Sequence, residues 1–306
     1  MRKKCLETIY KAAKQDSRVL FIGSDLGPGV LDSMKKEMPE RFFMEGISEQ
    51  HIIGMSAGLA FDGFLPFVNT ISTFLTRRCF EQITLDLCLH DLPVKLVGNG
   101  GGMVYAPLGP THQALDDFSL LRTLPNMTIV SPCDSIEMEK LVVDSLNWPH
   151  PIYIRIAKGG DPIITSENDE FKIGKAVLMN EPDNVLIIST GIMTQIAKEV
   201  VDYFKTKNIN IGILHLHTIK PLDTEVLKSI ITNVENIITL EEHYRDGGLG
   251  TSILEFCSET MPEHLYKIKR FGFNNKFSKN YGSQKEHINF NSLDSQSISS
   301  YIEEKI

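Results

Sequence analysis

The chain has 306 residues, of which 42% are hydrophobic and 23% charged, and its formal net charge is −8. These values are ordinary for a globular protein, and the length is enough for two domains. The negative charge argues against a surface that binds nucleic acid or anionic membranes, and no run approaches the ~18 apolar residues of a membrane span.

The N-terminal stretch and the cysteines indicate the compartment. The basic start MRKKCLETIYKAAK is not followed by the apolar region of a signal peptide. The five cysteines form no CxxC pair and are odd in number. We therefore expect reduced thiols in a cytoplasmic protein.

Short apolar runs alternate with amphipathic stretches in the first half of the chain. The strand-like runs are 18–26, 92–101, 127–132 and 151–157, and the helical patterns are 48–61, 74–90, 113–123 and 134–147. Strands that alternate with helices of this length indicate parallel βαβ units. The loops after the strands carry Gly, Ser, Asp and Asn, at the edge where open α/β sheets bind ligands.

A polar segment then separates this series from a second one. KGGDPIITSENDEFKI is rich in Gly and Asp, and the later βα patterns are 184–204, 210–223 and 236–257. We predict an α/β fold with two doubly wound, mostly parallel domains. The first covers residues 1–160, a linker covers 161–173, and a smaller domain covers 174–306.

Glu49 stands where an apolar, glycine-rich helix begins, in GISEQHIIGMSAGLAFDGF. An acid in a first helical turn can be there only because the helix dipole favours it, with Ser48 as the N-cap. However, the small residues that follow let another backbone or a flat ligand approach closely. The next segment, NTISTFLTRRCFEQI, adds an aromatic residue and an arginine pair, so a functional site around Glu49 is the competing interpretation.

Several stretches together resemble the transketolase family, whose members use thiamine diphosphate. GISEQHIIGMSAGLAFDGFLPF, STFLTRRCFEQI and GPTHQALDDFSLLRTLPNMTIVSPCD resemble its pyrimidine-binding domain, and HTIKPLD and EEHYRDGGLG resemble its C-terminal domain. The resemblance covers nearly the whole chain in the family's order. The family also includes deoxyxylulose-phosphate synthase and the β-subunits of 2-oxoacid dehydrogenases.

The resemblance implies which residues bind the cofactor. Glu49 matches the acid that hydrogen-bonds a ring nitrogen of the aminopyrimidine and so promotes loss of a proton from the reacting carbon, which requires a dry site. Phe74 matches the aromatic that packs on the ring face, although a core phenylalanine would look the same. Asp25 matches an acid beside the cofactor, with a strand-end turn as the alternative, and Arg78 is assigned to the same site.

The resemblance also implies which residues contact the substrate. His112 in LGPTHQ matches a catalytic histidine that hydrogen-bonds an oxygen of the donor as the C–C bond breaks. Arg155 in YIRIA and Arg2 in MRKK align with arginines that grip a sugar phosphate bidentately, although Arg2 could be only a solvated charge.

The sequence departs from ordinary transketolases around the acceptor. Leu108 stands where the family has an aspartate in GEDGPTHQ that binds an acceptor hydroxyl. Gly29 and Gly100 replace a serine and a histidine that bind phosphate. These changes predict an acceptor that is larger, lacks the phosphate, or carries its charge elsewhere.

The family's diphosphate and metal motif, GDG followed by NN, has no counterpart here: DGG at 246–248 and NN at 274–275 are in the wrong domain and order. We therefore expect a separate N-terminal subunit that carries GDG…NN and holds Mg²⁺ (or Ca²⁺). The two chains would form an α2β2 heterotetramer with thiamine diphosphate at the subunit interfaces.

The expected reaction is transfer of a two-carbon ketol unit from a ketose to an aldose by a split transketolase, of which this chain is the C-terminal subunit. The enzyme alternatives are a deoxyxylulose-phosphate synthase-like enzyme and a 2-oxoacid dehydrogenase E1 β-subunit. A non-catalytic regulatory subunit is the alternative of another class.

Overall fold

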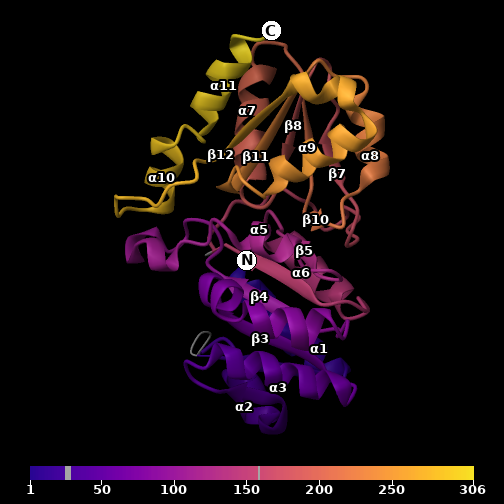
Figure 1. Cartoon of the computed structure of the whole chain (residues 1–306), viewed down its shortest axis with the longest axis vertical. Coiled ribbons are helices and arrows are strands. Elements are labelled where there is room, and N and C mark those ends of the chain that lie inside the picture. The colour runs from indigo at the N-terminus through magenta and orange to yellow at the C-terminus, as the bar shows by residue number, and fades with distance from the viewer. Residues whose placement is uncertain (25–28, 158) are drawn as a thin grey trace.

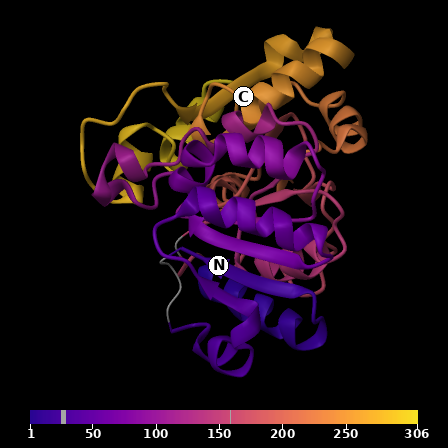
Figure 2. The same ribbon diagram turned by 60° about the horizontal axis from the view of Figure 1, so that its bottom comes forward.

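The computed structural model describes residues 1–24, 29–157 and 159–306, so Asp25 lies outside the described residues. The chain forms two α/β halves stacked along the long axis, the N-terminal half below the C-terminal half in Figure 1. Each half is a sheet with helices on both faces (Figure 2). Among the described residues, no helix is both long and apolar enough to cross a membrane.

The first sheet has seven strands in the order β10-β5-β6-β4-β3-β1-β2. The strands from the N-terminal half pair in parallel. Their bounds are β1 Val19–Gly23, β2 Phe42–Met44, β3 Leu65–Ile71, β4 Lys95–Asn99, β5 Thr128–Val130 and β6 Ile152–Ile156. Strands β1, β4 and β6 are buried along their whole length, as expected for a parallel sheet that is covered on both faces.

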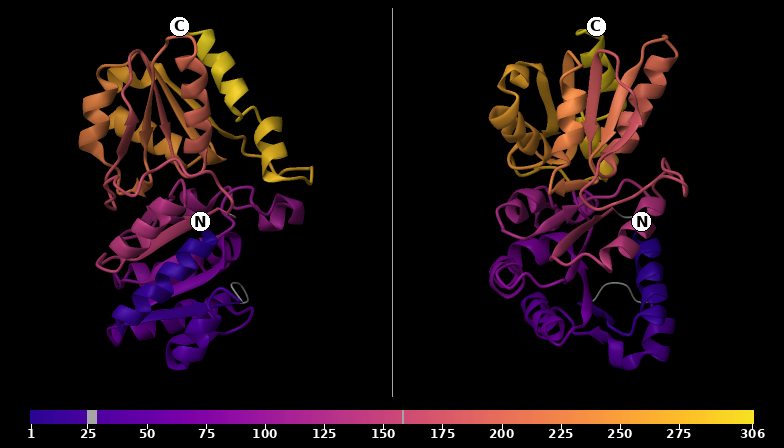
Figure 3. Two further views of the ribbon diagram at one scale, coloured as in Figure 1. Left: turned by 180° about the vertical axis from the view of Figure 1, so that it is seen from behind. Right: turned by 90° about the vertical axis from the view of Figure 1, so that its right-hand side faces the viewer.

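Helices cover the two faces of this sheet with separate apolar clusters. On one face lie α1 (Arg2–Gln15), α2 (Asp32–Glu37) and α6 (Ser135–Ser145), with α1 beside α6 (Figure 3). The other face is covered by α3 (Glu49–Phe61), α4 (Phe80–Gln82) and α5 (Asp117–Arg122). Two π-helical turns flank α4: η2 Phe74–Arg78 and η3 Ile83–Cys88. Three short 3₁₀ turns are described in the same half: η1 Pro39–Arg41, η4 Ala106–Leu108 and η5 Pro110–His112.

Strand β10 (Thr218–Lys220) crosses from one half to the other. It lies after β9 (Ile211–His215) in the chain, yet it pairs antiparallel with β5 at the edge of the first sheet, with Thr218 opposite Val130. The backbone N–H of Ser131 also donates to the carbonyl oxygen of His217 at 2.7 Å. A segment that we assigned to the second domain thus completes the sheet of the first half.

The second sheet has five strands in the order β12-β11-β8-β9-β7, parallel except for the edge strand β7. The bounds are β7 Val177–Asn180, β8 Val185–Ser189, β9 Ile211–His215, β11 Asn236–Tyr244 and β12 Ile268–Phe273. Its helices are α7 Met193–Lys205, α8 Thr224–Ile231, α9 Leu249–Thr260, η6 Pro262–Lys267, α10 Gln284–Phe290 and α11 Ser295–Glu303. Helix α11 packs along α7 (Figure 3), while α8 and α9 cover the opposite face.

The structure confirms the α/β fold with two mostly parallel sheets, and it differs in detail. Strands β2 and β3 were not predicted, because β2 has only three residues and β3 contains Pro66 as its second residue. The helical pattern over 74–90 does not form one regular helix, since π-helical turns widen it at both ends.

Candidate active site

Glu49 is the first residue of α3, and its side chain is only 3% exposed. Ser48 occupies the N-cap position but makes no capping hydrogen bond, because its Oγ donates to the carbonyl oxygen of Glu45 at 2.9 Å. The Glu49 carboxylate accepts a hydrogen bond from Arg78 Nη1 at 2.6 Å. The position is therefore more than a capped helix start, since a buried carboxylate needs a partner of this kind.

Arg78, Phe74 and His112 extend this contact into a cluster. The π-helical turn Phe74–Arg78 places the Arg78 guanidinium over the Phe74 ring, 4.4 Å from its centroid. The Phe74 ring meets the His112 ring edge-on, with centroids 5.2 Å apart and planes at 68°. Three separate segments thus bring together four of the predicted site residues, and a π-helical turn at a functional site is common.

Polar side chains that were not singled out from the sequence lie at the carboxyl ends of neighbouring strands. Ser24 Oγ lies 2.8 Å from Thr70 Oγ1, and Asn99 Nδ2 donates to Asn69 Oδ1 at 2.6 Å. These residues follow or end β1, β3 and β4, which are adjacent in the sheet. Their signal in the sequence was the run of polar residues at each strand end, which marks this edge as a ligand-binding edge.

The segment with Leu108 and His112 forms two 3₁₀ turns joined at Gly109, whose φ is +81°. Leu108 is 55% exposed, and His112 Nδ1 lies 2.9 Å from Thr111 Oγ1. The C-terminal segment before α10 reaches this turn, because a Cβ at Gly109 would come within 3.0 Å of the Tyr281 ring. Figure 1 shows this yellow segment descending beside the magenta loop.

Arg2 lies at the start of α1, and its Nη1 is 3.4 Å from the hydroxyl of Tyr105. Tyr105 in turn lies where a side chain at Gly100 would be, since a Cβ there would clash with its ring at 2.1 Å. Arg2 is thus near one of the positions where the sequence departs from the family. No contact in the described structure joins it to the Glu49 cluster, and its assignment to substrate binding stays a prediction.

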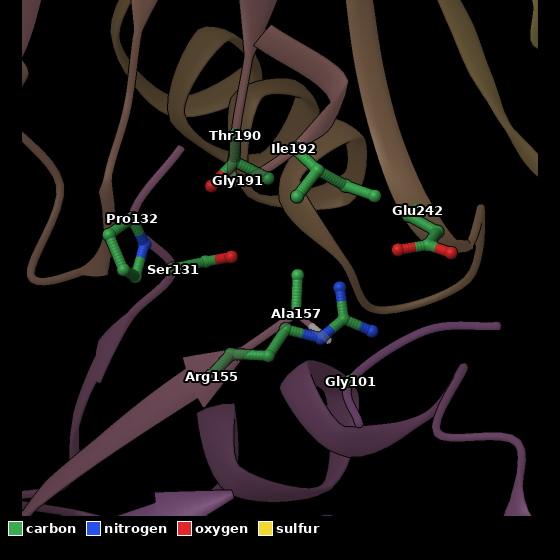
Figure 4. A pocket seen from close by; sticks show the side chains of 9 residues that line it. All are labelled: Gly101, Ser131, Pro132, Arg155, Ala157, Thr190, Gly191, Ile192 and Glu242. Carbon is green, nitrogen blue, oxygen red and sulfur yellow. The ribbon is translucent and has the colours of Figure 1, made fainter. Parts of the chain in front are cut away.

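Arg155 lies at the crevice between the halves and is 6% exposed (Figure 4). Its Nε is 2.9 Å from Asp117 Oδ2, although the N–H is poorly aligned with that oxygen, and its Nη2 donates to the carbonyl oxygen of Ala114 at 2.6 Å. The guanidinium also packs over the Phe118 ring at 4.3 Å. The structure thus gives Arg155 internal partners, and its assignment to a sugar phosphate stays a prediction.

Strand β11 carries three adjacent buried titratable residues, of which Glu242 lines the same crevice. Burial raises the pKa of Glu241 to about 7 and raises the pKa of Glu242 above its ordinary value. Glu242 Oε1 accepts from the backbone N–H of Met103 at 2.9 Å and from Gln284 Nε2 at 2.8 Å. Burial lowers the pKa of His243 to about 3. The cavity lined by Glu242 and Arg155 is about 10 Å³, room for one water molecule.

Within the described residues, one group of side chains has the spacing of metal ligands: Cys133, Glu137 and His215. Glu137 Oε2 lies 2.9 Å from His215 Nε2 and accepts from the backbone N–H of Cys133 at 2.6 Å. Burial alone would raise the pKa of Glu137, but the charge and hydrogen bond of His215 lower it to about 2. These partners satisfy one another, and a sulfur-containing set is a poor site for Mg²⁺, which prefers oxygen ligands.

Comparison with known proteins decides the family. Residues 1–160 match the family model of the transketolase pyrimidine-binding domain, and residues 174–296 match that of the transketolase C-terminal domain. The chain belongs to the transketolase family. It has the extent of the C-terminal subunit of a split transketolase, since it is 35% identical to one subunit of the apulose-4-phosphate transketolase of Phocaeicola vulgatus, over 94% of each chain.

Other transketolase-family relatives differ in length. The chain is 36% identical to the 1-deoxy-D-xylulose-5-phosphate synthase of Clostridium perfringens (strain ATCC 13124), over 95% of this chain but only 47% of that protein. The chain thus spans about half the length of the synthases it matches. Among solved structures, a split-gene transketolase described as an inactive β4 tetramer superposes with a TM-score of 0.90 and 28% identity, over 99% of this chain and 97% of that one.

The transketolase site in this chain fits one end of thiamine diphosphate. The buried Glu49 carboxylate and the Phe74 face suit the aminopyrimidine ring, and the buried Asn99 Oδ1 accepts no hydrogen bond from any described residue. No group of three or more Asp, Glu, His or Cys side chains lies close enough together at this edge to hold Mg²⁺ among the described residues. The residues present therefore match the ring end of the cofactor, and the described part of the chain shows no carboxylate cluster for its metal end.

Proposed function

We propose that this chain is the C-terminal subunit of a two-chain transketolase that uses thiamine diphosphate and moves a two-carbon ketol unit from a ketose to an aldose. One observation carries the proposal: Glu49, Phe74 and His112 form one cluster in a chain that is 35% identical, over 94% of its length, to a subunit of a known transketolase. A decayed, non-catalytic chain has no physical reason to keep a costly buried carboxylate beside an aromatic face.

When bound, thiamine diphosphate supplies a carbon nucleophile and an electron sink. Glu49 would hydrogen-bond the ring nitrogen and exchange a proton with it through its carboxyl group, at a position where the Glu49 side chain is only 3% exposed. Phe74 packs on the ring face and fixes its orientation. His112 hydrogen-bonds an oxygen of the donor sugar as the C–C bond breaks.

The other site assignments from the sequence remain part of the proposal. Asp25 and Arg78 belong to the cofactor site, and Arg2, Leu108 and Arg155 contact the sugar. The boundaries at 1–160, 161–173 and 174–306 remain the proposed domains, although β10 is shared between the sheets. Catalysis takes place in the cytoplasm.

The partner is an N-terminal subunit with a GDG…NN motif that holds the diphosphate through Mg²⁺ (or Ca²⁺). Two copies of each chain form an α2β2 assembly in which neither chain is active alone. Two observations support this arrangement: the relative of equal length is named a subunit, and among the described residues no group of three or more Asp, Glu, His or Cys side chains lies at the site to hold the metal. The Leu108 turn favours an acceptor unlike the usual pentose phosphates.

A second function is favoured by the 36% identity to the deoxyxylulose-phosphate synthases. Such an enzyme would make 1-deoxy-D-xylulose 5-phosphate. The product separates the two functions: formation of this deoxy sugar phosphate supports the synthase, and transfer of a ketol unit from a ketose to an aldose supports the transketolase.

The test is calorimetry and activity on this chain, on its GDG…NN partner, and on the mixture. We expect weak binding of thiamine diphosphate and Mg²⁺ by this chain alone, and tight binding and ketol transfer by the mixture. In the mixture, Glu49→Gln should abolish nearly all turnover while much of the cofactor affinity remains, because an amide can hydrogen-bond the ring but cannot hold the proton. Micromolar cofactor binding by this chain alone would contradict the division of the site.

A further inference from the structure

We infer that Arg78 is a placeholder for the aminopyrimidine ring: it occupies the ring's two partners in the free chain and must move away when the cofactor enters. This inference rests on the proposed function, because that function puts the ring between Glu49 and Phe74. It assigns Arg78 a gating role in place of a direct contact with the bound ring.

The Arg78 guanidinium lies where the proposed function places the aminopyrimidine ring. A guanidinium is flat and carries N–H donors at its edge, so it can stack on an aromatic face and bind a carboxylate together. Arg78 does both, with Cζ 4.4 Å from the Phe74 centroid and Nη1 2.6 Å from Glu49 Oε2. A pyrimidine ring that stacks on the same face and bonds the same oxygen cannot fit while the guanidinium stays.

The exposures show why such a placeholder is useful and why it can leave. The Glu49 side chain is 3% exposed, so without a cation or a ring beside it the carboxylate would be buried and unpaired. The Arg78 side chain is 43% exposed and can turn toward solvent. Arg78 therefore keeps Glu49 paired until the cofactor takes over the hydrogen bond.

The neighbouring Arg77 provides a matched control. Its Nε and Nη2 bind Asp116 at 2.8 Å each, and Nη2 also donates to the carbonyl oxygen of Gln113. No contact in the described structure joins Arg77 to Glu49 or to the Phe74 ring. Arg77→Ala therefore removes the same charge one position away and leaves the placeholder in place.

The first experiment uses the free chain and needs no cofactor. Arg78→Ala should lower Tm by roughly 3–6 °C because it leaves Glu49 unpaired, and this loss should shrink when Glu49→Gln is also present. If Arg78→Ala lowered Tm equally with and without the Glu49→Gln substitution, the two side chains would not be coupled, and that result overturns the inference.

The second experiment measures binding of the ring. The probes are 4-amino-5-hydroxymethyl-2-methylpyrimidine on the free chain, followed by NMR, and thiamine diphosphate on the complex, followed by calorimetry. Arg78→Ala should bind both about 3- to 10-fold more tightly than the wild type, because more of the population is open to the ring, while Arg77→Ala should not. Weaker binding would make Arg78 a direct cofactor contact, and unchanged binding would mean that it does not obstruct the ring; either result overturns the inference. A wild-type complex that binds no thiamine diphosphate would instead refute the proposed function.

Discussion

Leu108 is the residue that most separates this chain from ordinary transketolases, and it stands at the exposed end of the turn before Gly109. An aspartate here would accept a hydrogen bond from an acceptor hydroxyl, and a leucine cannot. A charged hydrogen bond is worth roughly 1.5–3 kcal/mol, and the exposure of this position reduces that gain through solvent screening.

We predict that Leu108→Asp shifts the ratio of kcat/KM for α-hydroxylated over deoxy or branched acceptors by about fivefold, in favour of the α-hydroxylated ones. The measurement is steady-state kinetics of the complete enzyme with matched acceptor pairs. Ile163→Asp is the control, because Ile163 is 60% exposed and lies in the segment between the two halves. A wild type that strongly prefers ribose 5-phosphate, with no shift in the variant, would refute an unusual acceptor.

The site residues divide into those that local sequence reveals and those that it does not. Glu49, Phe74, Arg78 and His112 were predicted because each stands in a motif, and the structure brings them together, while their roles stay predictions. The internal partners of Arg155 could not be foreseen, because Asp117 lies 38 positions away and meets it only through the packing of α5 on β6.

At the scale of elements, β11 carries three consecutive buried residues with shifted pKa values, Glu241, Glu242 and His243. His243 is fully buried and stacks on Phe118, with ring centroids 5.1 Å apart. Its Nδ1 lies 2.6 Å from the carbonyl oxygen of Tyr244 and its Nε2 accepts from the backbone N–H of Ser119 at 3.4 Å. One nitrogen donates and the other accepts, which suits a neutral imidazole.

We predict that the stability difference between wild type and His243→Gln shrinks as the pH falls from 6.5 to 4. Burial holds the pKa of folded His243 at about 3, below the ordinary value of 6.5. Its stabilising contribution is therefore complete above pH 6.5 and declines by up to about 1.4 kcal/mol per pH unit as the pH falls. Urea unfolding across this range measures the difference.

Glu241 acts in the opposite direction, because burial raises its pKa to about 7, and its Oε2 lies 3.9 Å from His243 Nδ1, so the comparison is made in a Glu241→Gln background as well. His51→Gln is the control, since the His51 side chain is 63% exposed. A wild type and His243→Gln whose stability curves stay parallel from pH 6.5 to 4 would show that His243 is not held neutral by the fold.

How far elements could be predicted depended on their length and regularity. The runs that became β1, β4 and β6 are apolar because both of their faces are covered, and this pattern is visible in the sequence. Strand β10 has only three residues, and it forms by pairing with the edge strand β5. That pairing depends on the assembled sheet and leaves no pattern in the local sequence.

At the scale of the whole molecule, β10 means that the two halves are not independent. We predict that a fragment of residues 1–173 self-associates, because β5 then presents unpaired N–H and C=O groups at the sheet edge. Size-exclusion chromatography would measure this, and a peptide of residues 216–221 should reverse it where a scrambled peptide does not. A monomeric fragment with the stability of the whole chain would show that β10 is dispensable.

Because β10 is synthesised after the other strands of the first sheet, that sheet is completed late during synthesis on the ribosome. Val130 is synthesised roughly 90 residues before Thr218, its partner across the ladder. At about 5–20 residues per second, the nascent first half waits for its last strand for about 4–18 s. During that time its β5 edge is open to the wrong chain, including a second nascent copy on the same messenger. Slow codons between these two positions would lengthen that exposure and lower the yield of folded protein.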